Sequence, residues 1–260
     1  MDNIKNKVRI FGINIDVLSM SQSVQLISQW ISAPERDCKF VVTPNIDHVV
    51  KLSSNQDFVK AYQHAALVVT DGKPLLMIAK LLGEKIQETV PGSDLVPAIF
   101  DAYKAANQEL TVFLLGAAPH VAEQAKLLIN QQWQPVVVVG TYSPDFGFEH
   151  NVQESNHICQ LINTSKADLL VIGLGAPKQE LWIHQYAHNI SVKVALCVGA
   201  TIDFIAGEKK RAPMLMRFFC IEWVYRMFSE PKRLMPRYFY DAWVFPRLFV
   251  KELYQRLFKA

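Results

Sequence analysis

The sequence has few of the residues from which metal sites and disulfide frameworks are built. It holds four cysteines, at positions 38, 159, 197 and 220, and no two of them form a C-x-x-C pair. This spacing argues against a zinc knuckle or a redox motif and is typical of reduced thiols in the cytosol. His184 and His188 are four residues apart but lack a nearby acid of the H-E-x-x-H kind. We therefore expect no protein-bound metal and no cofactor.

Long apolar runs are also missing. No window offers 18 or more apolar residues, so we expect no membrane-spanning helix. The first 20 residues contain no uninterrupted apolar region, so we expect no signal peptide and a cytoplasmic protein. Because 50% of the residues are hydrophobic and 11% are aromatic, the chain can still bury a sizeable core and is not disordered.

The glycines do not form the patterns that bind dinucleotides or ATP. Gly173-x-Gly175 is not part of G-x-G-x-x-G, and no G-x-x-x-x-G-K-[ST] occurs. Both absences disfavour a nicotinamide oxidoreductase and an ATP-dependent enzyme. No serine or cysteine lies in a G-x-S-x-G setting, so the sequence shows no nucleophile of that kind.

Charge is unevenly distributed, although the net charge is only +3. Residues 207–260 carry 12 Lys and Arg against 5 Asp and Glu, and they also hold 13 of the 28 aromatic residues. A basic, aromatic tail indicates an anionic partner, such as a membrane surface or substrate phosphates. A reader of nucleic-acid duplexes would need a recognition motif that this sequence lacks, so we expect no nucleic-acid partner. The alternative is a helical cap whose aromatics fill a core and whose arginines are solvated.

Apolar strand-like segments alternate with small-residue loops and helical segments over most of the chain. Residues 8–17 predict a strand or hairpin that bends at Gly12, and further strands are expected at 39–42, 67–70, 111–115, 135–140, 168–172 and 193–198. Repetition of this kind predicts parallel βαβ units, hence an α/β fold with a mostly parallel sheet flanked by helices.

The pattern changes near residue 207, where strands cease. Helices are expected over 214–228, 233–240 and 245–259, broken by Pro231, Pro236 and Pro246. We therefore predict a catalytic core at 1–206 and a basic, aromatic helical appendage at 207–260, joined by a solvent-exposed link at 207–211.

Four predicted strands end in polar or glycine-rich loops, at residues 43–48, 70–72, 116–118 and 173–175. Such loops converge on one edge of a parallel sheet, where open α/β folds bind ligands. Asp71 follows the strand-like run Leu67-Val-Val-Thr70 directly and precedes Gly72. An acid at this place is either a catalytic base or a turn former that bonds its own backbone.

Other residues near these loops have two interpretations each. Gly116 and Gly173 would let backbone N–H groups approach a phosphate at a helix N-terminus. Gln179 lies in the first helical turn after Pro177 and either reaches into the cleft or caps its helix. His48 is a candidate base or a structural histidine. In the tail, Arg226, Arg233 and Arg237 offer planar donor forks that suit phosphate.

With these stretches assembled, the chain resembles the WecG/TagA/CpsF glycosyltransferase family along nearly its whole length. The matching segments, in family order, are VVTPNIDHV, VVTDGKP, VPGSDL, FLLGAAP, VIGLGAPKQE, CVGATIDFIAGEKKRAP and EWVYRMFSEPKRLMPRY. The resemblance implies a Rossmann-like core and a metal-independent transfer of a sugar from a UDP donor, of the N-acetylmannosamine type or a related hexose. It implies as acceptor a sugar on a membrane polyprenyl diphosphate, in surface or exopolysaccharide assembly. It also implies an appendage that completes the active site at the inner face of the cell membrane.

The resemblance assigns roles to individual residues. The family's proposed base falls on Asp71 and its appendage arginine on Arg226. The expected substrate-binding residues are Thr43, Asn45, Gly72, Gly116, Gly173, Gly175, Gln179 and Arg233. Where many members have arginine before V-x-G-x-D-L, this chain has Thr89. A phosphate or acceptor contact made by that arginine is therefore not expected here, and the donor sugar can differ. The alternative function is a nucleotide-sugar or anionic-lipid binding module without catalysis.

Overall fold

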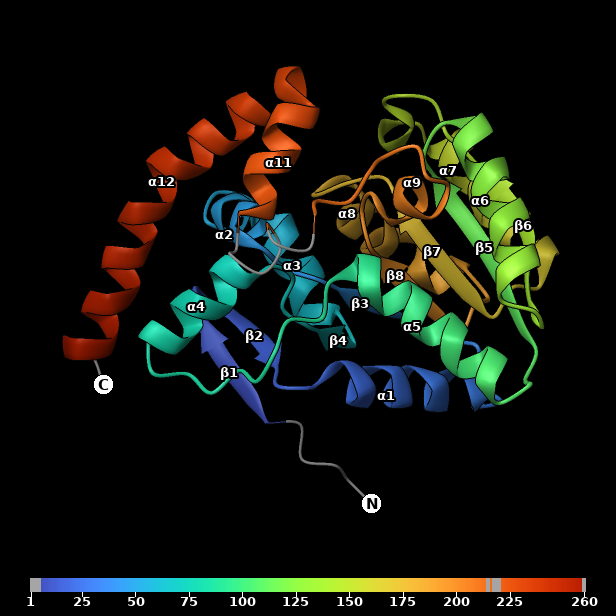
Figure 1. The fold of residues 1–260 in the computed structure, drawn as a ribbon, viewed down its shortest axis with the longest axis horizontal. Helices are drawn as coiled ribbons and strands as arrows, with labels where there is room; N and C mark the ends of the chain where they lie inside the picture. Colours follow the sequence, from blue (N-terminus) through green and yellow to red (C-terminus); the bar gives the residue numbers. More distant parts are fainter. Residues whose placement is uncertain (1–5, 214–215, 217–220, 259–260) are drawn as a thin grey trace.

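The computed structural model describes residues 6–213, 216 and 221–258. A six-stranded parallel sheet lies between two layers of helices (Figure 1). In spatial order its strands are β4 (Leu67–Val68), β3 (Lys39–Val42), β8 (Val194–Cys197), β7 (Leu169–Gly173), β5 (Leu110–Gly116) and β6 (Val136–Tyr142). The predicted α/β class with a mostly parallel sheet is confirmed, and helices follow the strands as in βαβ units.

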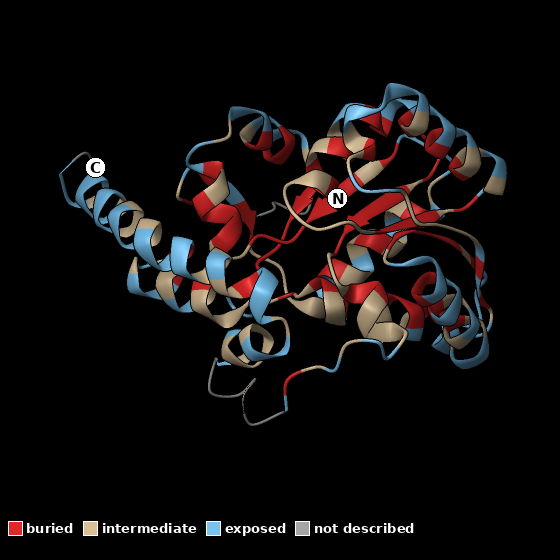
Figure 2. Ribbon diagram, turned by 90° about the horizontal axis from the view of Figure 1, so that it is seen from above, coloured by how far each residue is buried: buried red, intermediate tan, exposed pale blue. Residues whose placement is uncertain are grey.

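The central strands are almost entirely apolar because the sheet is covered on both faces. Every residue of β8 is buried, as are the first four residues of β7 (Figure 2), which is typical of parallel sheets. The register pairs Val42 with both Val68 and Cys197, and it pairs Gly116 with Gly173. The carboxyl ends of these strands are therefore level, and the loops that follow them meet at one edge.

Nine helices accompany the sheet in the part of the core that the structure describes. They are α1 (Met20–Ser32), α2 (Ile46–Leu52), α3 (Gln56–His64), α4 (Lys73–Leu81), α5 (Gly92–Ala105), α6 (Pro119–Gln132), α7 (Val152–Ser165), α8 (Lys178–Tyr186) and α9 (Thr201–Ile205), with short 3₁₀ turns at Phe148–His150 and Ala187–Asn189. Ser19 caps α1 in a capping box with Gln22, and Asn45 caps α2, as their residue types predict. Helices α2, α3, α7 and α8 cover one face of the sheet, and α1, α5, α6 and α9 cover the other.

The N-terminal segment is the predicted hairpin. Strands β1 (Lys7–Ile10) and β2 (Ile13–Asp16) pair antiparallel, and Phe11 and Gly12 join them with φ values of 51° and 80°. Two successive positive φ angles are characteristic of a type I′ turn, which explains the glycine at the bend.

The C-terminal helices differ from expectation. Helix α11 (Glu222–Ser229) ends before Pro231, as predicted, but α12 (Pro231–Phe258) is continuous through Pro236 and Pro246. The predicted breaks at these two prolines are wrong. Both Pro246 and Ala242, whose carbonyl it leaves without a partner, are exposed, so water can satisfy that carbonyl. Residues 214, 215 and 217–220 of the expected helix lie outside the described residues.

The predicted link at 207–211 is only partly exposed. Gly207, Glu208 and Lys210 face solvent. Lys209 instead forms ion pairs with Asp203 and Glu230, and Arg211 pairs with Asp94. Among the described residues no helix is long and apolar enough to cross a membrane.

Candidate active site

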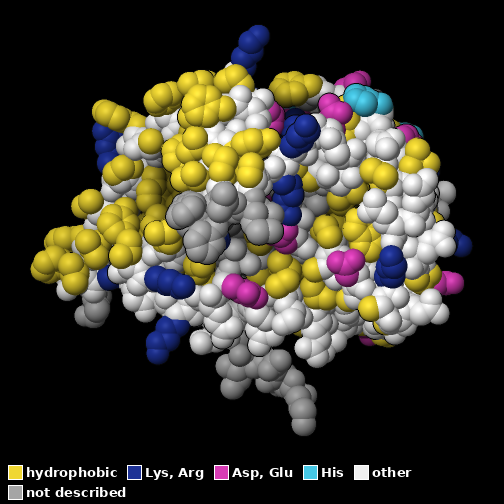
Figure 3. All heavy atoms as spheres, viewed as in Figure 1, with side chains coloured by type: hydrophobic (Ala, Val, Ile, Leu, Met, Phe, Trp, Pro, Cys, Tyr) yellow, Lys and Arg dark blue, Asp and Glu magenta, His cyan; other side chains and the backbone are white. Residues whose placement is uncertain are grey.

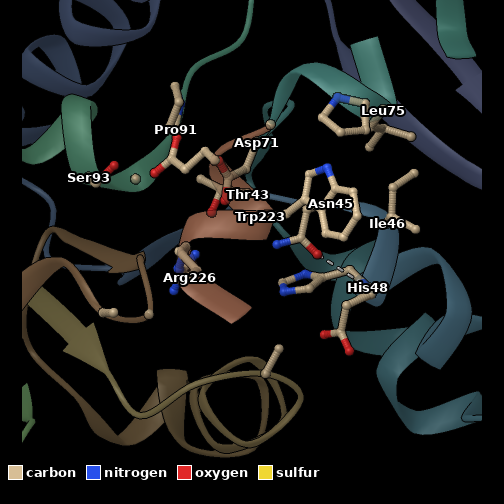
Figure 4. Close-up of a pocket in the computed structure, with 18 of the residues that line it drawn as sticks. Thr43, Asn45, Ile46, His48, Asp71, Leu75, Pro91, Ser93, Trp223 and Arg226 are labelled. Atoms are coloured by element: carbon tan, nitrogen blue, oxygen red, sulfur yellow. Dashed lines mark hydrogen bonds between the residues drawn. The ribbon is translucent and has the colours of Figure 1, made fainter. Parts of the chain in front are cut away.

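A cavity of about 920 Å³ opens where the carboxyl ends of the strands meet α11 and α12 (Figure 4). Its lining contains eight of the ten predicted site residues: Thr43, Asn45, Asp71, Gly72, Gly175, Gln179, Arg226 and Arg233. The expectation that the loops after separate strands line one cleft therefore agrees with the structure for the loops after β3, β4 and β7. The loop after β8 and the start of α5 join them, contributing Gly199 and Ser93.

Gly116 and Gly173 are not among the residues that line the cavity. A Cβ on Gly116 would lie 2.7 Å from the Gly173 carbonyl, and a Cβ on Gly173 would lie 2.9 Å from the Gly199 oxygen. Side chains at either position would collide with neighbouring backbone. In this structure the two glycines allow close packing of three strand-end loops behind the cavity, and they present no surface to it.

Asp71 lies in the short loop between β4 and α4. Its backbone N–H donates to the Pro44 carbonyl at 2.8 Å, and the Val90 N–H donates to the Thr70 carbonyl, also at 2.8 Å. These two bonds fix the turn from the flanking loops. Gly72 takes the N-cap position of α4 with a φ of 85°, so the sharp bend is made by glycine. The Asp71 side chain lines the cavity.

The surroundings of Asp71 change its acidity. Burial of the carboxyl group against the cavity wall raises its pKa to about 6, with Arg226 and a side-chain hydrogen bond from Asn45 acting in the opposite direction. Glu222 and Asp94 add to the increase because like charges disfavour ionisation. The group is therefore mostly ionised at neutral pH, yet its pKa is near enough to that pH for it to take up a proton.

Thr43, Asn45 and His48 form the wall from the β3–α2 loop. Asn45 Oδ1 accepts the His48 N–H at 3.2 Å as the cap of α2, and Thr43 Oγ1 donates to the Cys197 carbonyl at 3.3 Å. His48 is buried, with Nδ1 2.6 Å from the Tyr62 hydroxyl. Burial lowers the pKa of His48 well below its usual value, helped by Lys51 and Arg237. A neutral, hydrogen-bonded His48 agrees better with the structural interpretation than with a base.

Gln179 connects two loops of the cavity wall. Its Oε1 accepts hydrogen bonds from the backbone N–H groups of Gly175 and Gly199, each at 3.2 Å, and its Nε2 donates to Glu180 at 2.8 Å. The side chain is almost fully buried. Both ends of the amide are thus used within the protein, which favours the capping interpretation. Gln179 shapes the site through Gly175 and Gly199, whose backbones line the cavity.

Four arginines line the side of the cavity formed by the C-terminal segment. Three have acidic partners: Arg211 with Asp94 at 2.5 Å, Arg233 with Glu230 at 2.8 Å, and Arg237 with Asp47 at 2.7 Å. Arg226 makes no salt bridge to any residue that the structure describes. Its guanidinium carbon lies 5.7 Å from the centroid of the Phe204 ring, and its charge acts on Asp71. Arg226 is therefore the cation best placed to meet an anion beside Asp71.

Arg211 was not singled out from the sequence. It belongs to the charged run at 207–211, which predicts a solvent-exposed link. In the folded chain it lies at the start of α5. There its Nη2 donates to Ser93 Oγ at 3.1 Å, and its Nε is buried without a partner in the described structure. Thr89 also lines the cavity. Among the described residues no group of three His, Cys, Asp or Glu side chains could hold a metal ion.

The chain is similar to known proteins along most of its length. The family model described as "Glycosyl transferase WecG/TagA/CpsF family" matches residues 8–259. Proteins of Staphylococcus aureus strains MRSA252, MW2 and NCTC 8325 are each 29% identical to the chain over 232 residues, which is 88% of this chain and 87% of theirs. Each bears the name N-acetylglucosaminyldiphosphoundecaprenol N-acetyl-beta-D-mannosaminyltransferase. The match spans both the sheet and the C-terminal helices, so the chain belongs to the WecG/TagA/CpsF family of glycosyl transferases.

Proposed function

We propose that this glycosyltransferase moves a hexose or N-acetylhexosamine from a UDP-linked donor onto a sugar carried by a polyprenyl diphosphate. The single observation that carries the proposal is Asp71, a carboxylate with a pKa of about 6 in a cavity that also holds Arg226. The names of the Staphylococcus relatives, which specify an N-acetylmannosaminyl group and a diphosphoundecaprenol acceptor, support this substrate class. The donor is of the UDP-N-acetylmannosamine or UDP-glucose type.

In the proposed reaction Asp71 acts as general base with inversion at the anomeric carbon. The acceptor hydroxyl oxygen forms a bond to that carbon while its proton passes to the Asp71 carboxylate. The bond between the anomeric carbon and the UDP oxygen breaks, and the electron pair leaves with UDP. Asn45, which hydrogen-bonds the same carboxylate, holds it in the orientation needed for proton transfer.

The departing diphosphate needs positive charge, which we assign to the arginines. Arg226 has no salt-bridge partner among the described residues, and a guanidinium can bind two phosphate oxygens at once. Arg233 lies nearby on α12, where Glu230 holds it at 2.8 Å. Such preorganised charge stabilises a leaving group effectively. We propose that no metal takes part.

We also propose that the enzyme works while bound peripherally to the inner face of the cell membrane. Figure 3 shows hydrophobic side chains gathered on the face that carries α11 and α12. Exposed aromatic residues of these helices are Trp223, Phe228, Phe239, Tyr240, Trp243, Tyr254 and Phe258. Aromatic rings favour headgroup depth, and nearby basic side chains are attracted to anionic lipid.

The proposal is tested with a panel of UDP-sugars and a synthetic polyprenyl-diphosphate glycan, read by mass spectrometry. We expect one hexose or N-acetylhexosamine to be added to the glycan, without added metal and with release of UDP. Binding of UDP without transfer across a broad acceptor set would contradict the catalytic proposal and would favour a binding module.

A further inference from the structure

The cavity has two chemically different ends. Thr43, Asp71, Ser93 and Arg226 lie at one end, and Ile46, Leu75 and Trp223 lie toward the other, with Asn45 and His48 beside them (Figure 4). Lys73 and Asp241 also line the cavity. The transfer reaction as proposed requires only the polar end, because donor, acceptor hydroxyl and leaving diphosphate are all hydrophilic. The proposed transfer therefore assigns no ligand to these apolar side chains.

Three helices form the walls of this apolar end. On the core side, Pro74 and Leu75 open α4, and Ile46 opens α2. On the opposite side, α12 contributes Tyr238, Ala242, Phe245 and Pro246, which recur at helical spacing and so share one face. Phe245 packs edge to face on Phe11 of the N-terminal hairpin, with ring centroids 5.4 Å apart. The wall on α12 is thus held at a fixed distance from the core.

The apolar lining continues outward from the cavity. Helix α4 exposes Met77 and Leu81 beyond Leu75, and α12 exposes Val250 and Leu253 beyond Pro246. The two helices meet again further along, where Arg256 of α12 donates to the Leu82 carbonyl at 3.2 Å and pairs with Glu84 at 2.7 Å. Between the cavity and Arg256, apolar side chains of both helices face solvent.

Charge marks the junction of the two ends. Arg233 and Arg237 line the cavity from the same helix as Ala242 and Phe245, about one to three turns before them. A ligand held here would place an anionic group at the arginines, a polar group toward Asp71 and an apolar chain toward Phe245. A sugar linked through a diphosphate to a lipid has these three parts in that order.

We propose that the apolar end of the cavity, between α4 and α12, binds the first isoprene units of the acceptor's lipid chain. The chain leaves the protein past Met77 and Leu81, and the acceptor's diphosphate lies at Arg237, while Arg226 and Arg233 serve the departing UDP. This inference rests on the proposed function and adds to it that the enzyme recognises the lipid inside the site as well as at a membrane surface.

Two soluble acceptors distinguish binding of the lipid chain in this subsite from binding of the enzyme to a membrane. They carry the same sugar diphosphate, esterified in one to methyl and in the other to geranyl, and they are compared without vesicles or detergent. We expect kcat/KM for the geranyl acceptor to exceed that for the methyl acceptor roughly tenfold, since each contact in a hydrophobic pocket discriminates on that scale. Ala242→Gln and Pro246→Gln, both at exposed positions of α12, should each reduce this ratio to about one.

Ala105→Gln, at an exposed position of α5 outside the cavity lining, is the matched control and should keep the full ratio. Equal use of both acceptors by the unaltered enzyme would overturn the inference and leave the proposed function standing. An equal loss with both acceptors in the two α12 variants would also overturn it. If the unaltered enzyme transfers to the polyprenyl-diphosphate glycan but to neither soluble acceptor, this inference is overturned alone. Absence of transfer to all three acceptors would overturn the proposed function as well.

Discussion

Arg237 on α12 forms an ion pair with Asp47 on α2, with 2.7 Å between Nη2 and the carboxylate oxygen. Asp47 is almost fully buried, and Lys51 pairs with the same oxygen at 2.6 Å. Lys51 also donates to the Ala176 carbonyl at 2.9 Å, in the loop that precedes α8. One buried carboxylate therefore joins the C-terminal helix to two walls of the cavity.

Asp47→Asn should loosen α12 from the core. The change leaves Arg237 and Lys51 without their charged partner, and a charged hydrogen bond of this kind contributes about 1–3 kcal/mol. We expect faster hydrogen exchange in α12, a lower unfolding free energy and reduced transfer activity. Asp57→Asn is the matched control, because Asp57 pairs with Lys60 at the surface of α3. If α12 exchanges at the same rate in both variants, the ion pair does not hold the helix.

The pH dependence of activity should report Asp71. Since burial raises the pKa of this carboxyl to about 6, kcat/KM should rise with pH, reach half its maximum near pH 6 and level off above pH 7. Glu222→Gln removes a negative charge that raises the pKa of Asp71, so the midpoint should shift to lower pH. A midpoint that does not respond to Glu222→Gln would show that another group controls the profile.

Glu180 should make the protein less stable as pH rises. Burial raises its pKa to about 7 from an ordinary value of 4.5, so the folded protein binds the proton more tightly than the unfolded chain. The unfolding free energy then falls between about pH 5 and pH 8. Glu180→Gln should remove this part of the pH dependence. Between these two pH values the unfolding free energy of the variant should therefore rise by about 3 kcal/mol relative to that of the parent protein. Parallel stability curves, measured by urea unfolding, would contradict the assignment.

Gly173→Ala tests the close packing of the strand-end loops. The new Cβ would lie 2.9 Å from both the Gly199 oxygen and Ile202 Cδ1, and overpacking of this kind costs about 1–3 kcal/mol. Activity should fall as well, because Gly199 lines the cavity. Gly83→Ala is a useful comparison, since its Cβ meets nothing within 4 Å and only the positive φ is unfavourable, at about 1–2 kcal/mol. Equal thermal stability of Gly173→Ala and the parent protein would show that the loops move apart freely.

Trp243→Ser should weaken binding to vesicles that contain anionic lipid. Trp243 is 67% exposed on α12, and Arg247 lies 4.7 Å from its ring centroid, so the pair offers an aromatic ring and a cation to the same surface. Phe146→Ser removes a ring that is 99% exposed on a loop far from α12 in the sequence and should leave flotation with vesicles unchanged. Equal losses in both variants would indicate that any exposed ring suffices.

Much of the site could be predicted because parallel strands place their carboxyl ends at one edge. Thr43, Asn45 and Asp71 follow apolar strands directly in the sequence, so their meeting at the cavity follows from the fold class. Arg211 could not be found in this way, since nothing in the run at 207–211 indicates that the chain turns back toward α5. Its partner Asp94 is 117 residues away.

Two other predictions are wrong because a proline or a glycine can serve more than one structural purpose. Pro246 was expected to end a helix, but its exposed position lets water satisfy the carbonyl that it leaves without a partner. Gly116 and Gly173 were expected to approach a phosphate, whereas the structure packs them against each other. Sequence spacing does not show whether a glycine admits a ligand or a neighbouring backbone, because both need the same small residue.

The central claim is that the Asp71 carboxylate removes the proton of the acceptor hydroxyl. The most direct measurement compares single-turnover transfer and UDP binding in the parent enzyme and in Asp71→Asn, which keeps the size of the side chain and removes the base. The account predicts that the rate of transfer falls at least about a hundredfold while the affinity for UDP and the thermal stability change little. Transfer by Asp71→Asn at the rate of the parent enzyme would contradict it.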